Sequence, residues 1–303
     1  MLLTRRDFSK LALAALPATL LAKPNSKIGG VQLGLNVPYS YHGLPGTADD
    51  ILKFTTGLNI SAVELRSQPV EAYFGAPSSS RIGALRDDAA IAELTTWRLA
   101  APMAKFKEFR KKYEDAGILI QIVKFDGVDK MKDEVVDYAF ELAHTLGAHA
   151  LSCEIPLSKT EWLGKFATKH KLMVGYHGHT NVTSPEAFAK PESWEKAMSY
   201  SKYNGINLDL GHFTAANNTS PIPFLQRYVD RVTHVHVKDR KLNNGPNVPF
   251  GQGDTPIKEV LQLMRKEQYK FQATIEFEYP VPEGSDVLKE IAKCVEYCRN
   301  CLV

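Results

Sequence analysis

Several features that would place this chain in other protein classes are missing. No G-x-G-x-x-G follows the first apolar run, which argues against a dinucleotide-binding fold. No apolar run reaches the ~20 residues that a membrane span needs. We also find no linker, low-complexity tract or internal repeat, so the 303 residues are expected to form one main domain.

A large excess of positive charge is also missing. The formal net charge is +3, and Arg5, Arg6 and Lys10 against Asp7 supply +2 of it near the N-terminus, so about +1 is left for the rest (3 − 2 = 1). A domain that binds phosphate backbones usually has a clear basic excess. We therefore expect no nucleic-acid partner.

Cysteine is rare, and three of the four cysteines stand close together near the end of the chain. Cys294, Cys298 and Cys301 have the spacing C-x3-C-x2-C, within a stretch of helical periodicity. Buried cysteine packs as a small apolar residue, so we interpret the three as helix packing. A redox or metal role for them is the alternative.

The N-terminus has the pattern of an export signal. Arg5 and Arg6 precede an apolar run of about 12 residues, from 11 to 22, which resembles a twin-arginine signal. We assign residues 1–26 to this signal and a short linker, with cleavage expected near 20–22, and residues 27–303 to the folded domain. The expected location is periplasmic, with no stable membrane insertion after removal of the signal. The alternative is a short amphipathic helix.

The remaining chain alternates between strand-like and helix-like stretches. Such alternation with near-continuous apolar strands predicts a parallel sheet, and eight units in ~280 residues favour a closed (β/α)8 TIM barrel in a single domain. The segment 68–101 is expected to be a long loop with an additional helix above the active face. Helices are predicted at 131–146, 186–199, 257–266 and 287–301. The strands are predicted at Val31–Leu35, Ala62–Leu65, Ile118–Val123, Ala150–Cys153, Leu172–Tyr176, Ile206–Leu210, Val232–Val237 and Ala273–Phe277.

Polar side chains gather where these strands end, which is where the active sites of such barrels lie. Carboxylates and imidazoles that converge there would repel one another or stay unsatisfied without a cation, so we expect one divalent metal ion: Mn²⁺, Zn²⁺, Co²⁺ or Mg²⁺. Alternation along strand seven places His234, His236 and Lys238 on one face. His234 is expected to be a hydrogen-bonded core residue, and Glu64 to pair with Arg66 or with a neighbouring strand end. The predicted metal ligands are Glu154, Asp209, His236 and Glu276.

The motifs Y-H-G-H, L-D-L-G-H, H-V-H-V-K-D and I-E-F-E, with G-Q-G between the last two, resemble the sugar phosphate isomerase/epimerase family of the xylose isomerase-like barrel superfamily. The resemblance covers roughly residues 27–303. It implies that Asp209, His236 and Glu276 bind metal and that His212 contacts substrate. It also implies that Lys238 assists proton transfer.

One departure from this pattern affects the expected mechanism. Ketose 3-epimerases of the superfamily have a metal-binding glutamate at the end of strand five, where this chain has His177, with His179 two residues later. Glu154 at the end of strand four is an alternative donor that would complete the metal shell. We therefore expect His179 or Lys238, and not a pair of carboxylates, to move the proton. His177, His179, His212 and Lys238 are the predicted catalytic residues.

The expected reaction is abstraction of a proton next to a carbonyl, through an enediolate, on a small-molecule sugar or glycoside. Its outcome is isomerisation or epimerisation, or lyase or hydratase chemistry on a 3-keto-sugar or 3-keto-glycoside. A non-catalytic sugar-binding or partner subunit is the alternative. An endonuclease IV-like nuclease is disfavoured because no histidine lies between Asp239 and Gly253. Assembly into a homo-oligomer is left open.

Overall fold

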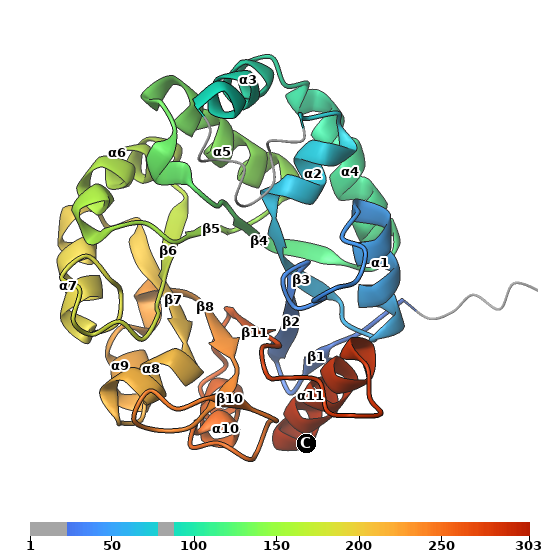
Figure 1. Cartoon of the computed structure of the whole chain (residues 1–303), viewed down its shortest axis with the longest axis vertical. Coiled ribbons are helices and arrows are strands. Elements are labelled where there is room, and N and C mark those ends of the chain that lie inside the picture. Colours follow the sequence, from blue (N-terminus) through green and yellow to red (C-terminus); the bar gives the residue numbers. More distant parts are fainter. Residues whose placement is uncertain (1–22, 78–87) are drawn as a thin grey trace, which may run out of the picture.

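Eight parallel strands pair side by side around a closed ring (Figure 1). The computed structural model describes residues 23–77 and 88–303. Because β2 pairs with both β11 and β3, the ring is complete, and the predicted single-domain (β/α)8 barrel is confirmed. The ring strands are β2 (Val31–Val37), β3 (Ala62–Arg66), β4 (Leu119–Lys124), β5 (Ala150–Cys153), β6 (Met173–His177), β7 (Asn204–Asp209), β8 (Val232–Val237) and β11 (Gln272–Ile275).

The short strands outside the ring were not predicted. Each has only two residues, too few to show a periodic pattern of apolar side chains. β1 (Lys27–Ile28) runs antiparallel to β2, while β9 (Asp239–Arg240) and β10 (Asn247–Val248) pair antiparallel with each other. Most of the predicted signal and linker, residues 1–22, lies outside the described residues. Ser26, which ends that predicted segment, is buried, and its hydroxyl donates to the Leu33 carbonyl at 2.7 Å.

The helices lie around the outside of the ring (Figure 1). The helix predicted at 257–266 is confirmed, and the one predicted at 131–146 begins two residues later and ends at Gly147, whose φ of 81° suits glycine. The one predicted at 186–199 begins at Pro191, a residue that favours the first helical turn. The helices are α1 (Ala48–Gly57), α2 (Ser67–Tyr73), α3 (Asp88–Leu99), α4 (Met103–Asp115), α5 (Asp133–Leu146), α6 (Thr160–His170), α7 (Pro191–Tyr200), α8 (Leu210–Asn217), α9 (Ile222–Arg227), α10 (Ile257–Lys266) and α11 (Val287–Leu302).

A buried ion pair ties together the segment that follows β3. This segment contains α2 and α3, and residues 78–87 between them lie outside the described residues. Glu71 of α2 accepts from Arg98 Nε of α3 at 2.7 Å, and their side chains are 0% and 5% exposed. The Arg98 guanidinium also lies over the Phe125 ring, 5.1 Å from its centroid. These contacts fix both ends of the long insertion against the barrel.

The inside of the ring is polar where the strands end, and the apolar core lies between strands and helices. Asn207 of β7, for example, is fully buried and donates to Ser152 of β5 at 3.1 Å. The three cysteines of α11 are buried and free, and no candidate metal-binding group among the described residues includes a cysteine. Their helix-packing interpretation agrees with this placement.

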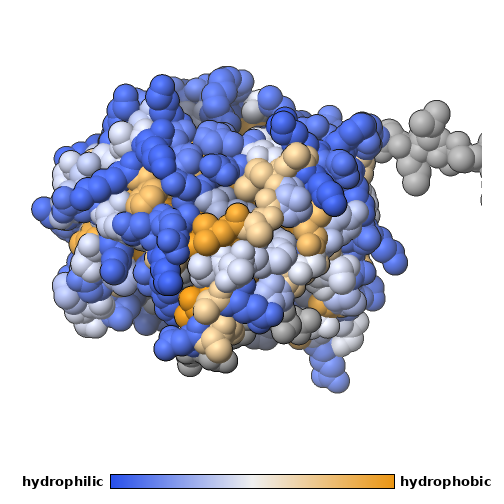
Figure 2. Space-filling view, turned by 90° about the horizontal axis from the view of Figure 1, so that it is seen from above, coloured by the Kyte–Doolittle hydropathy of each residue, from blue (hydrophilic) through white to orange (hydrophobic). Residues whose placement is uncertain are grey.

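The face shown in Figure 2 is mostly hydrophilic, with apolar residues in small groups. Scattered apolar side chains of this kind are ordinary on folded proteins. Among the described residues, no helix has both the length and the apolar character that a membrane crossing requires.

Candidate metal centre at the strand ends

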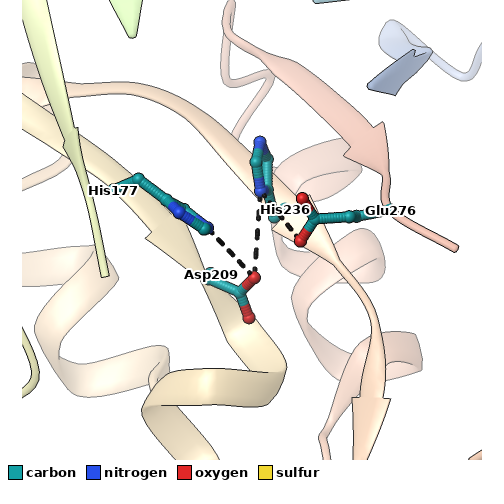
Figure 3. Close-up of side chains that lie close together, drawn as sticks. All are labelled: His177, Asp209, His236 and Glu276. Atoms are coloured by element: carbon teal, nitrogen blue, oxygen red, sulfur yellow. Dashed lines mark hydrogen bonds and ion pairs between the residues drawn. The ribbon is translucent and has the colours of Figure 1, made fainter. Parts of the chain in front are cut away.

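Four side chains from consecutive strand ends converge inside the ring (Figure 3). His177 ends β6, Asp209 ends β7, His236 lies in β8, and Glu276 follows β11. One nitrogen or oxygen atom of each lies within 4.8 Å of those of the other three, and all four residues are buried. We call these four residues the donor set. The sequence predicted three of them as ligands, together with Glu154.

The atoms that face the centre of the donor set are poorly satisfied by protein groups. His236 Nδ1 lies 3.3 Å from Glu276 Oε2 and 3.8 Å from Asp209 Oδ2, and His177 Nε2 lies 3.4 Å from the same Asp209 oxygen. His236 Nδ1 is buried without a hydrogen-bond partner, and Glu276 Oε2 has no well-aligned one, although the Lys238 ammonium lies 2.6 Å from it. Buried polar atoms normally have partners, and two nitrogens with two carboxylates suit Zn²⁺, Mn²⁺ or Co²⁺. The residues present therefore fit a divalent metal ion.

A buried carboxylate stands behind His236. Its Nε2 contacts Glu64 Oε2 of β3 at 2.5 Å, and Glu64 also lies 3.2 Å from His234 Nε2. Burial raises the pKa of Glu64, but the two histidines outweigh this and hold it well below its usual range. A carboxylate that accepts from the far nitrogen of a ligand histidine fixes the ring orientation and makes it a stronger donor. Glu64 thereby aims His236 Nδ1 at the donor set.

A second carboxylate, Glu154, stands behind His177. Its Oε1 lies 3.2 Å from His177 Nδ1, its Oε2 lies 3.0 Å from His179 Nε2, and the buried Lys124 ammonium contacts Oε1. Burial raises the pKa of Glu154, but Lys124 and the two histidines outweigh this effect and hold the pKa below its usual value. These bonds use both Glu154 oxygens. His177 thus lies with the other three donors, while Glu154 contacts it from outside this set and forms a second candidate metal-binding group with His177 and His179.

Lys238 lies against the donor set. Its Nζ is 2.6 Å from Glu276 Oε2 and 3.1 Å from Asp209 Oδ2, and it also contacts Glu278. Burial lowers the pKa of Lys238, but Asp209, Glu276 and Glu278 outweigh this and raise it above its usual value. These surroundings favour the charged ammonium, which donates protons and does not take them. Of the two base candidates, His179 is therefore the better placed.

His212 lies beside these groups, near the start of α8. Its backbone N–H donates to Asp209 Oδ1 at 2.7 Å, so Asp209 caps the helix as well as facing the donor set. The His212 ring centroid is 5.0 Å from that of His179. Arg240 Nη1 donates to His212 Nδ1 at 2.7 Å. The His212 and His179 rings thus lie side by side near the strand ends.

Several contacts of the site were not found by sequence reasoning. Glu64 was expected to pair with Arg66 or a neighbouring strand end, but Arg66 pairs with Asp126 at 2.5 Å and Glu64 reaches across the ring to β8. Asn36 of β2 donates to Glu276 Oε1 at 2.7 Å and was not singled out. A buried lysine at a strand end, as Lys124 is, would have been a usable signal. His234 is buried and hydrogen-bonded, as expected.

Comparisons with known proteins agree with the barrel fold. The model of the xylose isomerase-like TIM barrel family matches residues 157–300, a range that contains the whole donor set. An inosose dehydratase of Clostridium tetani (strain Massachusetts / E88) is 26% identical over 158 residues. That match covers 46% of this chain and 51% of the dehydratase, about half the length of each.

Solved structures share the fold over nearly the whole chain. The IOLI protein, solved with a zinc atom, is 13% identical with a TM-score of 0.62, covering 90% of this chain and 98% of IOLI. The 3-keto-D-glucoside 4-epimerase YcjR of E. coli is 9% identical with a TM-score of 0.61, covering 89% of this chain and 100% of YcjR. At such low identities the likeness establishes the barrel fold.

Proposed function

We propose that this protein is a divalent-metal-dependent enzyme that removes a proton next to the carbonyl group of a sugar and passes through an enediolate. The observation that carries the proposal is the buried donor set, in which His236 Nδ1 lacks a hydrogen-bond partner. The outcome is isomerisation or epimerisation, or carbon–oxygen lyase chemistry on a 3-keto-sugar or 3-keto-glycoside. We further propose a periplasmic location, because Arg5 and Arg6 precede an apolar run.

The similar proteins support a sugar substrate. A dehydratase matches part of the sequence, and a 3-keto-glucoside epimerase shares the fold. Dehydration and epimerisation can begin with the same step, loss of a proton beside a carbonyl. The residues around the donor set are suited to that step, whichever outcome follows.

The proton-transfer roles follow from position and charge. A divalent ion in the donor set would act as a Lewis acid and stabilise negative charge on the carbonyl oxygen. His179 is the proposed base, since its side chain is 49% exposed at the barrel mouth and Glu154 orients it through Nε2. Lys238 is the proposed proton donor, because it lies against the donor set and also contacts Glu278, a carboxylate outside that set that favours the ammonium.

The first test is metal content. Purified protein should carry about one divalent ion per chain, measured by plasma mass spectrometry, and Asp209→Ala and His236→Ala should lose it. Asp115→Ala and His144→Ala are matched controls, because both residues are exposed and remote from the donor set. Full occupancy in the two site variants would contradict the ligand assignment, and no ion in the wild type would contradict metal dependence.

The second test is turnover of a panel of keto-sugars and 3-keto-glycosides in deuterated water. Wild type should wash deuterium into the carbon next to the carbonyl. His179→Gln should keep its metal ion and lose about 10²- to 10⁴-fold in kcat, the usual cost of a lost general base. Turnover without any exchange would count against the enediolate. A protein that binds sugar but converts none would be the non-catalytic alternative.

A further inference from the structure

A hollow lies at the end of the barrel opposite to the donor set. Its volume is about 540 Å³, which is within the usual range for small-molecule sites. The residues that line it include His149 directly before β5, Met173 at the start of β6, Val232 at the start of β8 and Phe271 directly before β11. The donor set lies where the strands end, whereas this hollow lies where they begin. The proposed reaction does not use it.

The floor of the hollow is apolar. Val232, Thr233 and Phe271 line it and are buried, and Met173 beside them is half-buried. The Thr233 hydroxyl is already paired, because it lies 3.0 Å from the Ile206 carbonyl oxygen. A ligand that reaches this floor therefore meets mainly apolar surface, which favours an apolar group.

Two glycines of the ring make room for this floor. An added Cβ at Gly205 would meet Met173 Cε at 2.7 Å, and one at Gly175 would meet Thr233 Oγ1 at 2.2 Å. Any larger residue at these two positions would displace the side chains that form the floor. The floor is thus fixed by close packing inside the barrel, and a ligand would find it already formed.

The rim of the hollow is polar. Asp230 and Lys270 are exposed there with opposite charges, and neither has an ion-pair partner in the part of the chain that the structure describes. Gln268 uses its amide hydrogens toward the carbonyls of Gly29 and Arg265, at 2.9 and 2.6 Å, which leaves its Oε1 as an acceptor. The rim therefore offers both donors and acceptors, while its opposite charges favour an uncharged ligand.

His149 adds a further acceptor. Its Nε2 lies 3.1 Å from the Thr233 carbonyl oxygen, which can only accept, so Nε2 carries a hydrogen. Burial lowers the pKa of His149, which favours the neutral ring. In that form Nδ1 has a free lone pair, and no group among the described residues donates to it. A hydroxyl group of a ligand can do so.

We propose that this hollow binds an uncharged amphipathic glycoside, with an aromatic ring against the apolar floor and the sugar hydroxyls at the polar rim. The rings of Tyr269 and Phe271, whose centroids are 5.4 Å apart, form the wall beside that aromatic ring. The acceptors of the rim take hydrogen bonds from the hydroxyl groups, and the Lys270 ammonium donates one. Neither the metal ion nor the proposed reaction enters this inference.

Binding can be measured with phenyl β-D-glucoside, which has no carbonyl group and so cannot enter the proposed reaction. In protein with ¹³C-labelled methionine methyl groups, Met173→Leu identifies the Met173 signal by its disappearance. Titration should shift this signal saturably, with a Kd on the order of 0.1–1 mM for a ligand of this size. Methyl β-D-glucoside should bind at least ~10-fold more weakly, because it has no ring to bury on the floor.

Variants of the lining test the rim and the wall separately. His149→Leu should weaken binding by about 3- to 10-fold, the usual effect of one lost hydrogen bond. His144→Leu is its matched control, since His144 also donates to a backbone carbonyl, that of His170 at 3.0 Å, but lies outside the hollow. Tyr269→Ala should weaken binding too, whereas Tyr200→Ala, at an exposed tyrosine of α7, should not.

Several results would overturn the proposal. These are no saturable Met173 shift well above the expected Kd, equal affinity for the two glucosides, or equal effects of His149→Leu and His144→Leu. Asp209→Ala should bind phenyl glucoside as the wild type does, and loss of the shift there would place the glucoside at the donor set instead. A Met173 shift on raising the protein concentration alone would show a second copy of the chain in the hollow and would also refute the proposal. Absence of sugar turnover would leave this measurement unaffected.

Discussion

Replacing Lys238 by methionine should tighten metal binding. Methionine keeps an unbranched side chain of similar length but removes the ammonium, which lies 2.6 Å from Glu276 Oε2 and 3.1 Å from Asp209 Oδ2. These two oxygens are also the ones that approach the histidine nitrogens of the donor set. In the wild type, the ammonium and a divalent ion therefore compete for them.

The expected gain follows from the charges. Two unit charges ~4 Å apart interact by about 4 kcal/mol at the effective dielectric constant of ~20 that suits such sites. The full amount is not lost when an ion binds to the wild type, because Lys238 also contacts Glu278 and can retain that contact. The gain in the variant is therefore smaller than about 4 kcal/mol. We expect a net gain of roughly 1.5–3 kcal/mol, which corresponds to about 10- to 100-fold tighter binding.

The assay is competition for Zn²⁺ or Mn²⁺ against a chromophoric chelator, with wild type and variant measured side by side. Lys124→Met is the matched control, since Lys124 is equally buried but contacts Glu154 and not the donor set. It should change the affinity much less than Lys238→Met. Unchanged or weaker binding in Lys238→Met, or an equal gain in Lys124→Met, would refute the idea of direct competition.

Three further predictions concern other parts of the chain. Burial raises the pKa of the Cys294 thiol to about 12, so iodoacetamide should modify it only after unfolding; peptide mass spectrometry that finds fast modification of the native protein would contradict this. Glu71→Gln leaves Arg98 buried without its charged partner and should lower the free energy of unfolding by roughly 3–5 kcal/mol in chemical denaturation. An unchanged midpoint would show that this pair contributes little. Replacing Arg5 and Arg6 by lysine should leave the precursor in the cytoplasm; unchanged periplasmic delivery on cell fractionation would argue against the twin-arginine route.

The strands of the barrel could be predicted because buried strands have a recognisable amino-acid composition. A strand covered on both faces needs a near-continuous apolar run, and all eight runs lie within two residues of the observed strand ends. The donor residues were also accessible, because parallel strands end on the same side of the ring. Asp209, His236 and Glu276 could therefore be grouped without knowing any distance.

The partners of these residues could not be predicted, because they depend on how the strands are staggered. The pairing of β3 with β4 shifts register between Val63 and Glu64, and that of β7 with β8 shifts between Ile206 and Asn207. Such irregularities redirect the side chains next to them and leave no recognisable mark in a single sequence. Glu64 was therefore assigned to its neighbour Arg66 or a nearby strand end, when its partners lie across the ring on β8.

The two halves of the chain divide the construction of the site between them. All four residues of the donor set lie in the second half of the barrel. Three residues of the first half of the barrel contact these donors and orient them: Asn36, Glu64 and Glu154. A change in the first half can therefore alter the orientation, basicity and proton affinity of the donors while every donor stays the same. Half-barrel chimaeras with identical ligand residues would thus differ in how tightly they hold a metal, and two chains with the same strand-end motifs need not share one chemistry.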